Sequence, residues 1–195
     1  MIPKNIFIHP ISFAFALLLS PFLLFLTACD SSQNSKLTEF SADQVLEMPG
    51  QGKMIQKIYY APGKVRIEQN TPMGKMVSIM LTEKGVTLLL NPMTKTYMEM
   101  PSQSSEEMGV VDTEQKAKMK KIGTDTVEGI KCTKYEMEGG KGTVCLAEGA
   151  DIALKIEMDG GMSIYLQNIK PGQQDATLFQ VPEGYSKQAM PAFGM

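Results

Sequence analysis

The chain has 195 residues, of which 43% are hydrophobic and 21% are charged, and its formal net charge is -2. This length fits one domain or a small pair, and the ordinary charged fraction argues against a chain that is disordered throughout. The mildly acidic balance argues against nucleic-acid binding, which needs a basic patch or stripe. The composition also includes one His, three Cys, no Trp and 16 Met.

Residues 1–28 have the pattern of a secretory signal peptide. Lys4 is the only charged residue before Asp30, and a long apolar run follows it. The end of this run, Leu26-Thr27-Ala28-Cys29, resembles the lipobox of bacterial lipoproteins, which implies cleavage before Cys29 and a diacylglycerol on its thiol. A plain transmembrane anchor is the alternative, because the run is almost long enough to span a bilayer.

Removal of the signal peptide changes the chemistry that the chain can perform. Lys+Arg falls from 19 to 18 while Asp+Glu stays at 21, so the mature side chains sum to -3. The one histidine, His9, is lost with the signal peptide. Ser-His-Asp and Cys-His catalysis and His-ligated zinc or copper sites are therefore excluded for the mature chain.

After the signal peptide we expect a short tether and then one domain. Residues 29–38 are mostly polar and predict a flexible link between the lipidated Cys29 and a domain at 39–188, with a loose tail at 189–195. Asp30 directly follows the lipidated Cys, a pattern that in enterobacteria goes with retention in the inner membrane. We therefore expect a lipid-anchored protein of the cell envelope that faces the periplasm.

From about Phe40 onward the domain reads as short strands punctuated by turns, which is typical of an antiparallel sheet or partial barrel with about nine or ten strands. Met76–Leu81 and Val86–Leu90 are apolar on both faces and should be central strands. One helix is predicted, from Asp112 to Lys121, after a polar loop at Ser102–Met108. The expected strands are 54–60, 64–68, 76–81, 86–90, 97–100, 130–137, 142–146, 152–158 and 162–169.

Two cysteines, Cys132 and Cys145, remain once Cys29 carries lipid. Secretion places them in an oxidising compartment, so we expect a disulfide between them. Their midpoint falls at Glu138-Gly139, the centre of a predicted turn, which predicts that the two cysteines lie directly opposite each other in a hairpin. A redox or metal role is the alternative, but the sequence has no CxxC motif.

The mature chain carries 15 Met, since Met1 belongs to the signal peptide. Ordinary core filling, an adaptable apolar cavity for an acyl chain, and a thioether site for copper(I) are the three interpretations. By alternation along the predicted strands, Met54, Met80, Met98 and Met100 are the candidates to line a ligand cavity. The sequence singles out no catalytic residue, no cofactor and no metal-ligand motif.

Several motifs in order resemble a bacterial family labelled as a domain of unknown function. They cover most of residues 39–188 and are Lys64-Val65-Arg66-Ile67-Glu68, Asn91-Pro92 with Lys95-Thr96-Tyr97-Met98-Glu99-Met100, Gly123 to Cys132, and a closing strand around Asp175–Phe179 and Val181–Tyr185. That family is similar in layout to the periplasmic lipoprotein-carrier superfamily (LolA/LolB-like). The resemblance implies a curved antiparallel sheet, an incomplete barrel, with one or two helices beside an apolar cavity for acyl chains.

These observations favour a non-catalytic envelope lipoprotein that binds a hydrophobic ligand such as a lipid or acyl chain. An envelope protein-interaction or stress-sensing module with a closed core is the alternative. An enzyme comes third, because the acidic residues are scattered and no paired carboxylates are visible. The expected partners are the membrane, through the lipid on Cys29, and an acyl-chain ligand or an envelope protein, but not nucleic acid.

Overall fold

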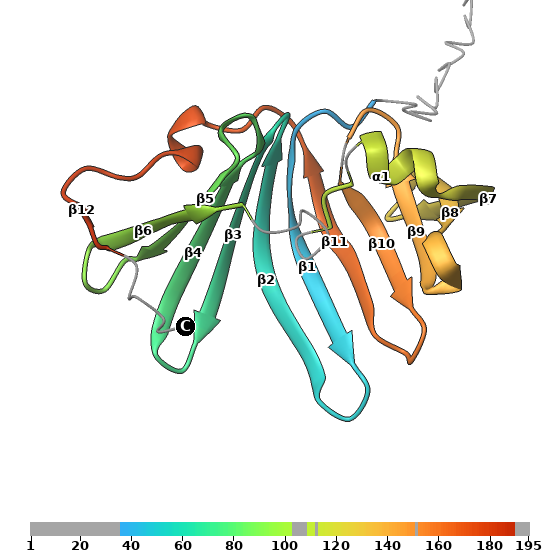
Figure 1. The fold of residues 1–195 in the computed structure, drawn as a ribbon, viewed down its shortest axis with the longest axis horizontal. Helices are drawn as coiled ribbons and strands as arrows, with labels where there is room; N and C mark the ends of the chain where they lie inside the picture. Colours follow the sequence, from blue (N-terminus) through green and yellow to red (C-terminus); the bar gives the residue numbers. More distant parts are fainter. Residues whose placement is uncertain (1–35, 103–108, 112, 151, 190–195) are drawn as a thin grey trace, which may run out of the picture. The chain divides into compact units, whose positions relative to one another are not determined.

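The computed structural model describes residues 36–102, 109–111, 113–150 and 152–189. It contains one open sheet of 12 strands that does not close into a barrel (Figure 1). The predicted fold class, a mainly β chain with little helix, is confirmed. The strands are β1 (Phe40–Met48), β2 (Gly52–Ala61), β3 (Lys64–Thr71), β4 (Gly74–Leu81), β5 (Val86–Asn91), β6 (Thr96–Pro101), β7 (Lys120–Val127), β8 (Ile130–Glu136), β9 (Gly142–Ala147), β10 (Ala153–Met158), β11 (Ser163–Pro171) and β12 (Ser186–Lys187).

The sheet consists of two antiparallel meanders joined side by side. The strand order is β12-β6-β5-β4-β3-β2-β1-β11-β10-β9-β8-β7, so β1–β6 form one meander and β7–β11 form the other. The first strand of one meander pairs with the last strand of the other, β1 with β11, across a register shift between Ser41 and Asp43. The short β12 then adds to the far edge, parallel to β6.

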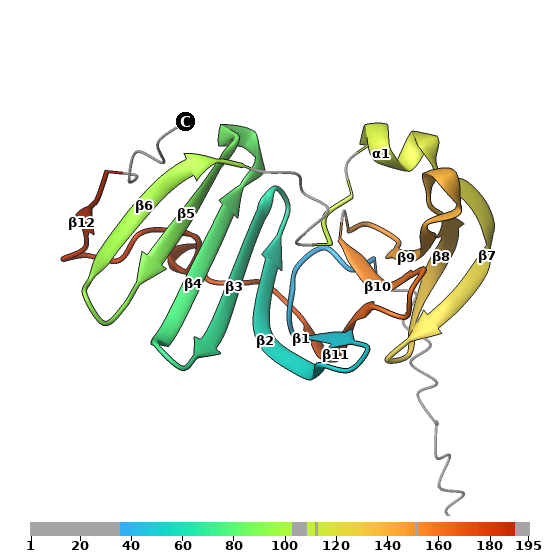
Figure 2. The same ribbon diagram turned by 60° about the horizontal axis from the view of Figure 1, so that its bottom comes forward.

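This topology requires a crossover on one face of the sheet. The strands β6 and β7 follow each other in sequence but lie near opposite edges, so the chain between them must cross the intervening strands. The described part of this connection includes Gly109–Val111, where Ala153 donates its backbone N–H to the Gly109 carbonyl at 2.7 Å and Val110 forms a β-bridge with Ile152. We call the side that packs against Val110 the crossover face; the helix α1 (Thr113–Lys118) lies on it, near β8 and β9 (Figure 2).

A buried core supports the crossover face at its centre. Phe40 and Tyr60 stack with ring centroids 5.2 Å apart, and both are almost fully buried. Val65 and Val110 belong to the same cluster, so the crossover segment closes this part of the face. Apolar burial of this kind is the main stabilising contribution of the fold.

The opposite face of β3–β6 is covered by the C-terminal segment, residues 172–188, which we call the strap. Its Phe179 is buried against a cluster that includes Ile79 and Leu90. Arg66 donates from Nη1 to the carbonyl oxygen of Leu178 at 2.8 Å, which ties the strap to β3. Cross-strand pairing places Arg66, Ile79 and their partner Leu88 on this same face. We call it the strap face.

Two sequence predictions about the type or bounds of elements are wrong. The helix expected over Asp112–Lys121 is only Thr113–Lys118, with Asp112 outside the described residues, because Lys120 and Lys121 already pair with β8 as the start of β7. The closing strand expected around residues 175–185 is instead a 3-10 turn, Ala176–Phe179, followed by irregular chain, and only Ser186–Lys187 form a strand. The Asp175 carboxylate accepts the Thr177 N–H at 2.8 Å, and Pro182 has no N–H for a ladder, so both residues favour a turn over a strand.

The apolar character of β4 and β5 predicted that they are central strands, and this prediction is wrong. They lie near one end of the sheet, and β1 and β11 occupy its middle. The physical reason is that burial on both faces does not require a central position. On β4, Ile79 is buried under the strap and Met80 under the crossover core, although the strand is close to the edge.

Candidate functional site

The four methionines predicted to line a cavity all lie on the crossover face. Pairing joins Met80 to Thr87 and Thr87 to Met100, and directly paired residues share a face. Met98 pairs with Leu89 one row further along the strands, and Met54 shares the face of Tyr60 by alternation on β2. The structure therefore brings these side chains to one face of β2–β6.

These methionines differ in burial, so one belongs to the core and the others lie at the surface. Met80 is 2% exposed and packs in the core cluster with Val65 and Val110, so it contributes to the core rather than to an open lining. Met54, Met98 and Met100 are half-buried. A fifth methionine, which the sequence analysis did not single out, lies on the same face of β4: Met76 is 37% exposed. We call Met54, Met76, Met98 and Met100 the methionine face.

Within the described ranges, two hollows lie along the crossover face. One of about 200 Å³ is lined by Met76, Leu89 and Met98, with polar residues of the β5–β6 turn and Gln188 of the strap around its rim. The other, of about 230 Å³, lies where Val110 covers Tyr60 and Val65. Pockets for drug-sized ligands usually measure about 300–1,000 Å³. Both hollows in the described part of the chain are therefore smaller than a usual ligand pocket.

A row of glutamine side chains crosses the crossover face, and these side chains already form hydrogen bonds within the protein. Gln44 is 2% exposed, and its Oε1 accepts a hydrogen bond from Gln56 Nε2 at 2.6 Å. Gln69 Nε2 points to the sulfur of Met54 at 2.9 Å. No buried side-chain polar atom lacks a partner among the described residues. This row therefore presents few unpaired polar atoms to a ligand. A ligand on the methionine face would be held mainly by apolar contacts with polarizable methionine side chains.

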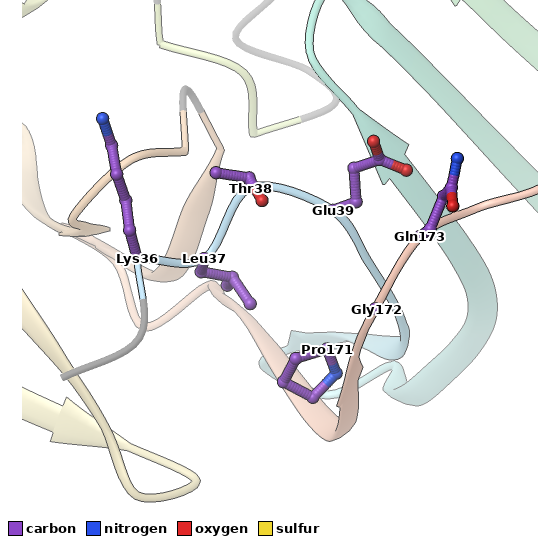
Figure 3. Close-up of a pocket in the computed structure, with 7 residues that line it drawn as sticks. All are labelled: Lys36, Leu37, Thr38, Glu39, Pro171, Gly172 and Gln173. Atoms are coloured by element: carbon purple, nitrogen blue, oxygen red, sulfur yellow. The ribbon is translucent and has the colours of Figure 1, made fainter. Parts of the chain in front are cut away.

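A third hollow, of about 250 Å³, lies where the chain enters the sheet (Figure 3). Residues 36–39 form one wall and Pro171–Gln173 the other. The side chains of Lys36 and Glu39 lie at opposite ends of the segment 36–39 and do not converge, whereas Glu39 lies beside Gln173 (Figure 3). The Glu39 carboxylate accepts the backbone N–H of Gln174 at 2.7 Å. These contacts hold the start of β1 against the end of β11.

The predicted disulfide between Cys132 and Cys145 is present, with Cα atoms 5.4 Å apart. The predicted direct opposition of the two cysteines is wrong. The register pairs Cys132 with Ala147 and Lys134 with Cys145, so the bond runs diagonally between β8 and β9. The turn Glu138–Gly140 sets this register two residues away from the one that the midpoint of the cysteines predicts. Both cysteines are buried and pack in the same core cluster.

Among the described carboxylates with lowered pKa values, Asp43, Glu68 and Glu157 form ion pairs, whereas Asp175 accepts hydrogen bonds from Thr177. A hydrogen bond from Asn168, helped by Lys57, holds the pKa of Asp43 below its ordinary value. Burial raises the pKa of Glu68, but hydrogen bonds from Lys75 and Arg66 outweigh it, and the net pKa is lowered. These groups stay ionised at neutral pH, unlike a general acid, whose pKa must be raised. No cluster of three or more His, Cys, Asp or Glu in the described residues could hold a metal ion.

The predicted lipidation site lies outside the described residues. Cys29, Asp30 and the apolar run before them are among residues 1–35, and the tail from residue 190 is also outside. Within the described ranges, no helix is long and apolar enough to cross a membrane.

Comparison with known proteins supports the family and the fold. A family model described as "Domain of unknown function (DUF4412)" matches residues 43–153. Among solved structures, an uncharacterized conserved protein from Thermus thermophilus is similar with a TM-score of 0.51 and 11% sequence identity. The match covers 78% of this chain and 90% of that one, and at this identity it shows the fold alone. No curated protein matches the chain.

Proposed function

Since the chain belongs to the DUF4412 family, whose description assigns no activity, we propose a function from the structure itself: a non-catalytic, membrane-tethered envelope lipoprotein that holds an apolar ligand, such as an acyl chain, on its methionine face. One observation carries this proposal. The crossover face is covered by Val110 and Val111 elsewhere, whereas Met76, Leu89, Met98 and Met100 remain at least partly exposed at or near the 200 Å³ hollow. Contiguous apolar surface of this kind commonly marks a binding site.

Methionine suits such a surface because its side chain is unbranched, flexible and polarizable. Met76 and Met98 border the same hollow, and Met100 lies two residues beyond Met98 on the same face of β6. An acyl chain laid along this face would contact adaptable side chains rather than a fixed cavity. A distant relationship to the lipoprotein carriers, in which an open sheet also holds acyl chains, is part of this proposal.

The proposed anchor is the lipid on Cys29. Seven residues, 29–35, separate that anchor from the described domain, and a chain of this length spans at most about 25 Å. The domain would therefore stay close to the membrane surface, with the inner membrane proposed from Asp30. A ligand drawn from a bilayer would have a short path to the sheet.

An envelope protein-interaction module is the second candidate, and one observation favours it. The two hollows that the described residues form on the crossover face measure about 200 and 230 Å³, less than a typical ligand pocket. A flat apolar face of this kind can dock a protein partner instead of a small molecule.

The test is a fluorescent fatty-acid displacement titration on the mature chain carrying Cys29→Ser. We expect saturable binding at micromolar concentration, with a lipid adduct in native mass spectrometry of gently purified protein. Met76→Lys should weaken binding at least tenfold, because it places a charge beside the hollow at a side chain that is already 37% exposed.

The matched control is Ile55→Lys. Ile55 is 57% exposed and lies on the opposite face of β2 from Met54, so its replacement should leave binding unchanged. Equal loss in both variants would point to destabilisation, which thermal unfolding would detect. Absence of any saturable binding by the parent chain would favour the protein-interaction module.

A further inference from the structure

Three hairpin tips of the first meander each carry a methionine beside a proline. These pairs are Met48-Pro49 after β1, Pro72-Met73 between β3 and β4, and Pro92-Met93 between β5 and β6. Alternate turns of an antiparallel meander lie at the same end of its strands, so the three tips form one row (Figure 1). We call Met48, Met73 and Met93 the methionine tips.

Two of the methionine tips expose nearly their whole side chains. Met73 is 89% exposed and Met93 is 71% exposed, the highest values among the five exposed large hydrophobic side chains of the described residues. A single exposed apolar side chain is ordinary on a protein surface. Two of them at neighbouring tips of one row indicate an interaction surface.

Local contacts hold both exposed tips in place. Thr71 Oγ1 accepts the backbone N–H of Met73 at 3.2 Å and donates to the carbonyl oxygen of Gly74 at 2.8 Å. Asn91 Oδ1 accepts the backbone N–H of Met93 at 3.0 Å. The Met93 side chain also folds back over the neighbouring hairpin, because a Cβ atom built on Gly74 would clash with the Met93 sulfur. The two tips therefore need little further ordering when they bind a partner.

The charged residues next to the tips are lysines. Lys53, Lys75 and Lys95 follow the three tips, and none of the three turns contains Asp or Glu. Lys53 pairs with Glu47 at 3.2 Å and Lys75 pairs with Glu68 at 2.7 Å, so much of this positive charge is neutralised. Apolar contact, with a smaller contribution from charge, should therefore supply most of the affinity for an anionic surface.

We propose that the methionine tips dock on a lipid bilayer, with Met73 and Met93 inserted among the headgroups. Neighbouring tips are about 10 Å apart, two strand spacings, and their apolar side chains stand separately. A protein interface needs a closely packed apolar core, whereas a bilayer surface accepts separate apolar tips without a complementary shape. This inference rests on the proposed membrane-tethered function, but docking requires neither the lipid on Cys29 nor a bound acyl chain.

Docking by the tips would bring the methionine face to the lipid surface. The hollow of about 200 Å³ is bordered by Asn91 and Thr94, on either side of the Pro92-Met93 tip, and by Met76, which lies three residues after Met73. An acyl chain that leaves the bilayer at the tips would meet this hollow first.

The proposed tether allows the tips to reach the membrane that holds it. The chain enters the sheet at Phe40, and β1 leads from there over nine residues, about 30 Å, to Met48. Residues 29–35 span at most about 25 Å. Strands inclined to the bilayer would thus bring the anchor and the tips to one membrane. Because the anchor keeps the domain at the surface, a weak affinity of the tips is sufficient.

The chain has no tryptophan, so one introduced indole reports its own surroundings. The experiment uses the mature chain with Cys29→Ser and Met73→Trp, mixed with vesicles of phosphatidylethanolamine and phosphatidylglycerol. We expect a blue shift of the tryptophan emission and quenching by lipids with brominated chains. The matched control is Lys84→Trp in the exposed β4–β5 turn at the opposite end of the same strands, whose emission should not change.

Aspartate at the tips should prevent docking. Met73→Asp combined with Met93→Asp should reduce sedimentation with these vesicles about tenfold, because the two side chains can no longer leave water favourably. Met73→Asp alone should have part of this effect. Its side chain is 89% exposed, so thermal unfolding of this single variant should match that of the parent.

The proposal is overturned if the Met73→Trp emission does not shift, if Lys84→Trp shifts equally, or if the double aspartate variant sediments like the parent. Fatty-acid binding without vesicle docking would overturn this inference alone and favour a protein partner at the tips. Vesicle docking without fatty-acid binding would instead leave the docking surface in place and contradict the proposed ligand.

Discussion

At the scale of single residues, a few side chains set the local geometry that the rest of the molecule depends on. Gly74 leaves the space that the Met93 thioether fills, and Asn91 fixes the turn that carries it. Cys132 and Cys145 join β8 and β9 near the end of the second meander. The cysteine pair could be identified from sequence because Cys132 and Cys145 are close together in the chain and flank one predicted turn, although the register between them could not. The Met93 contact could not, because it joins two turns that only sheet pairing brings together.

The disulfide is expected to stabilise the folded chain. Replacing Cys132 and Cys145 together with Ala should lower the free energy of unfolding by about 3 kcal/mol, because the closed loop of this length restricts the unfolded chain. Denaturant unfolding followed by far-ultraviolet circular dichroism would measure it. The parent under a thiol reductant should unfold at nearly the same denaturant concentration as the double variant. An unchanged midpoint in both would show that the bond contributes little.

At the scale of elements, the strap is held by a small charged network on β3 and β4. Arg66 pairs with Glu68 at 2.7 Å and also donates to the Leu178 carbonyl, and Lys75 pairs with the second oxygen of the same carboxylate. The Arg66 and Glu68 side chains are only 12% and 15% exposed. The network therefore orders the guanidinium that fixes the strap over Ile79 and Leu90.

Glu68→Gln should consequently reduce stability in a pH-dependent way. The pKa of Glu68 is lowered from its ordinary value of 4.5, so its contribution is fully present above about pH 4.5 and is lost as pH falls through the lower folded value. We expect the variant to be less stable than the parent by about 1 kcal/mol at pH 7, with the difference vanishing in stronger acid. Thermal unfolding between pH 3 and 7 measures this, with exposed Glu138→Gln as the control. A difference that does not depend on pH would mean that packing, and not charge, explains the effect.

At the scale of the whole molecule, two meanders meet at β1 and β11 and leave the two faces of β3–β6 unequally covered. The strap covers one face, and the crossover covers only part of the other. The methionine face is thus a consequence of topology. In the described part of the chain, Val110 covers the centre of the crossover face, while Met76, Met98 and Met100 on β4 and β6 remain at least partly exposed.

The proposed anchor acts at this scale too. Cys29→Ser should abolish labelling by a radioactive or clickable fatty acid and release the protein from the membrane fraction, or leave an unprocessed precursor. Stable anchoring needs more than one acyl chain, and a lipobox cysteine receives several. Fractionation of cells that express either form provides the measurement, with Ser31→Ala as a variant that should behave like the parent. A mutant that still labels and sediments with membranes would disprove the lipobox interpretation.

The amino-acid sequence by itself determined the local features of this protein. Alternation along Lys64–Glu68 predicts a strand without reference to any partner, and turn residues such as Asn91-Pro92 end strands through their own backbone preferences. Residues 29–195 contain no histidine, so this part of the chain supplies no imidazole, and the close spacing of the two cysteines correctly predicts their disulfide. Each of these follows from chemistry within a few residues.

Only the tertiary structure decided which strands are neighbours, which register they adopt and which faces remain open. Lys120 and Lys121 have good helix propensity but form β7, because pairing with β8 satisfies their backbone groups. The four candidate methionines alternate alike in sequence, yet Met80 is buried under Val110 while Met98 borders a hollow. The reason is that burial depends on what crosses above a side chain, and the crossover segment is distant from these strands in sequence.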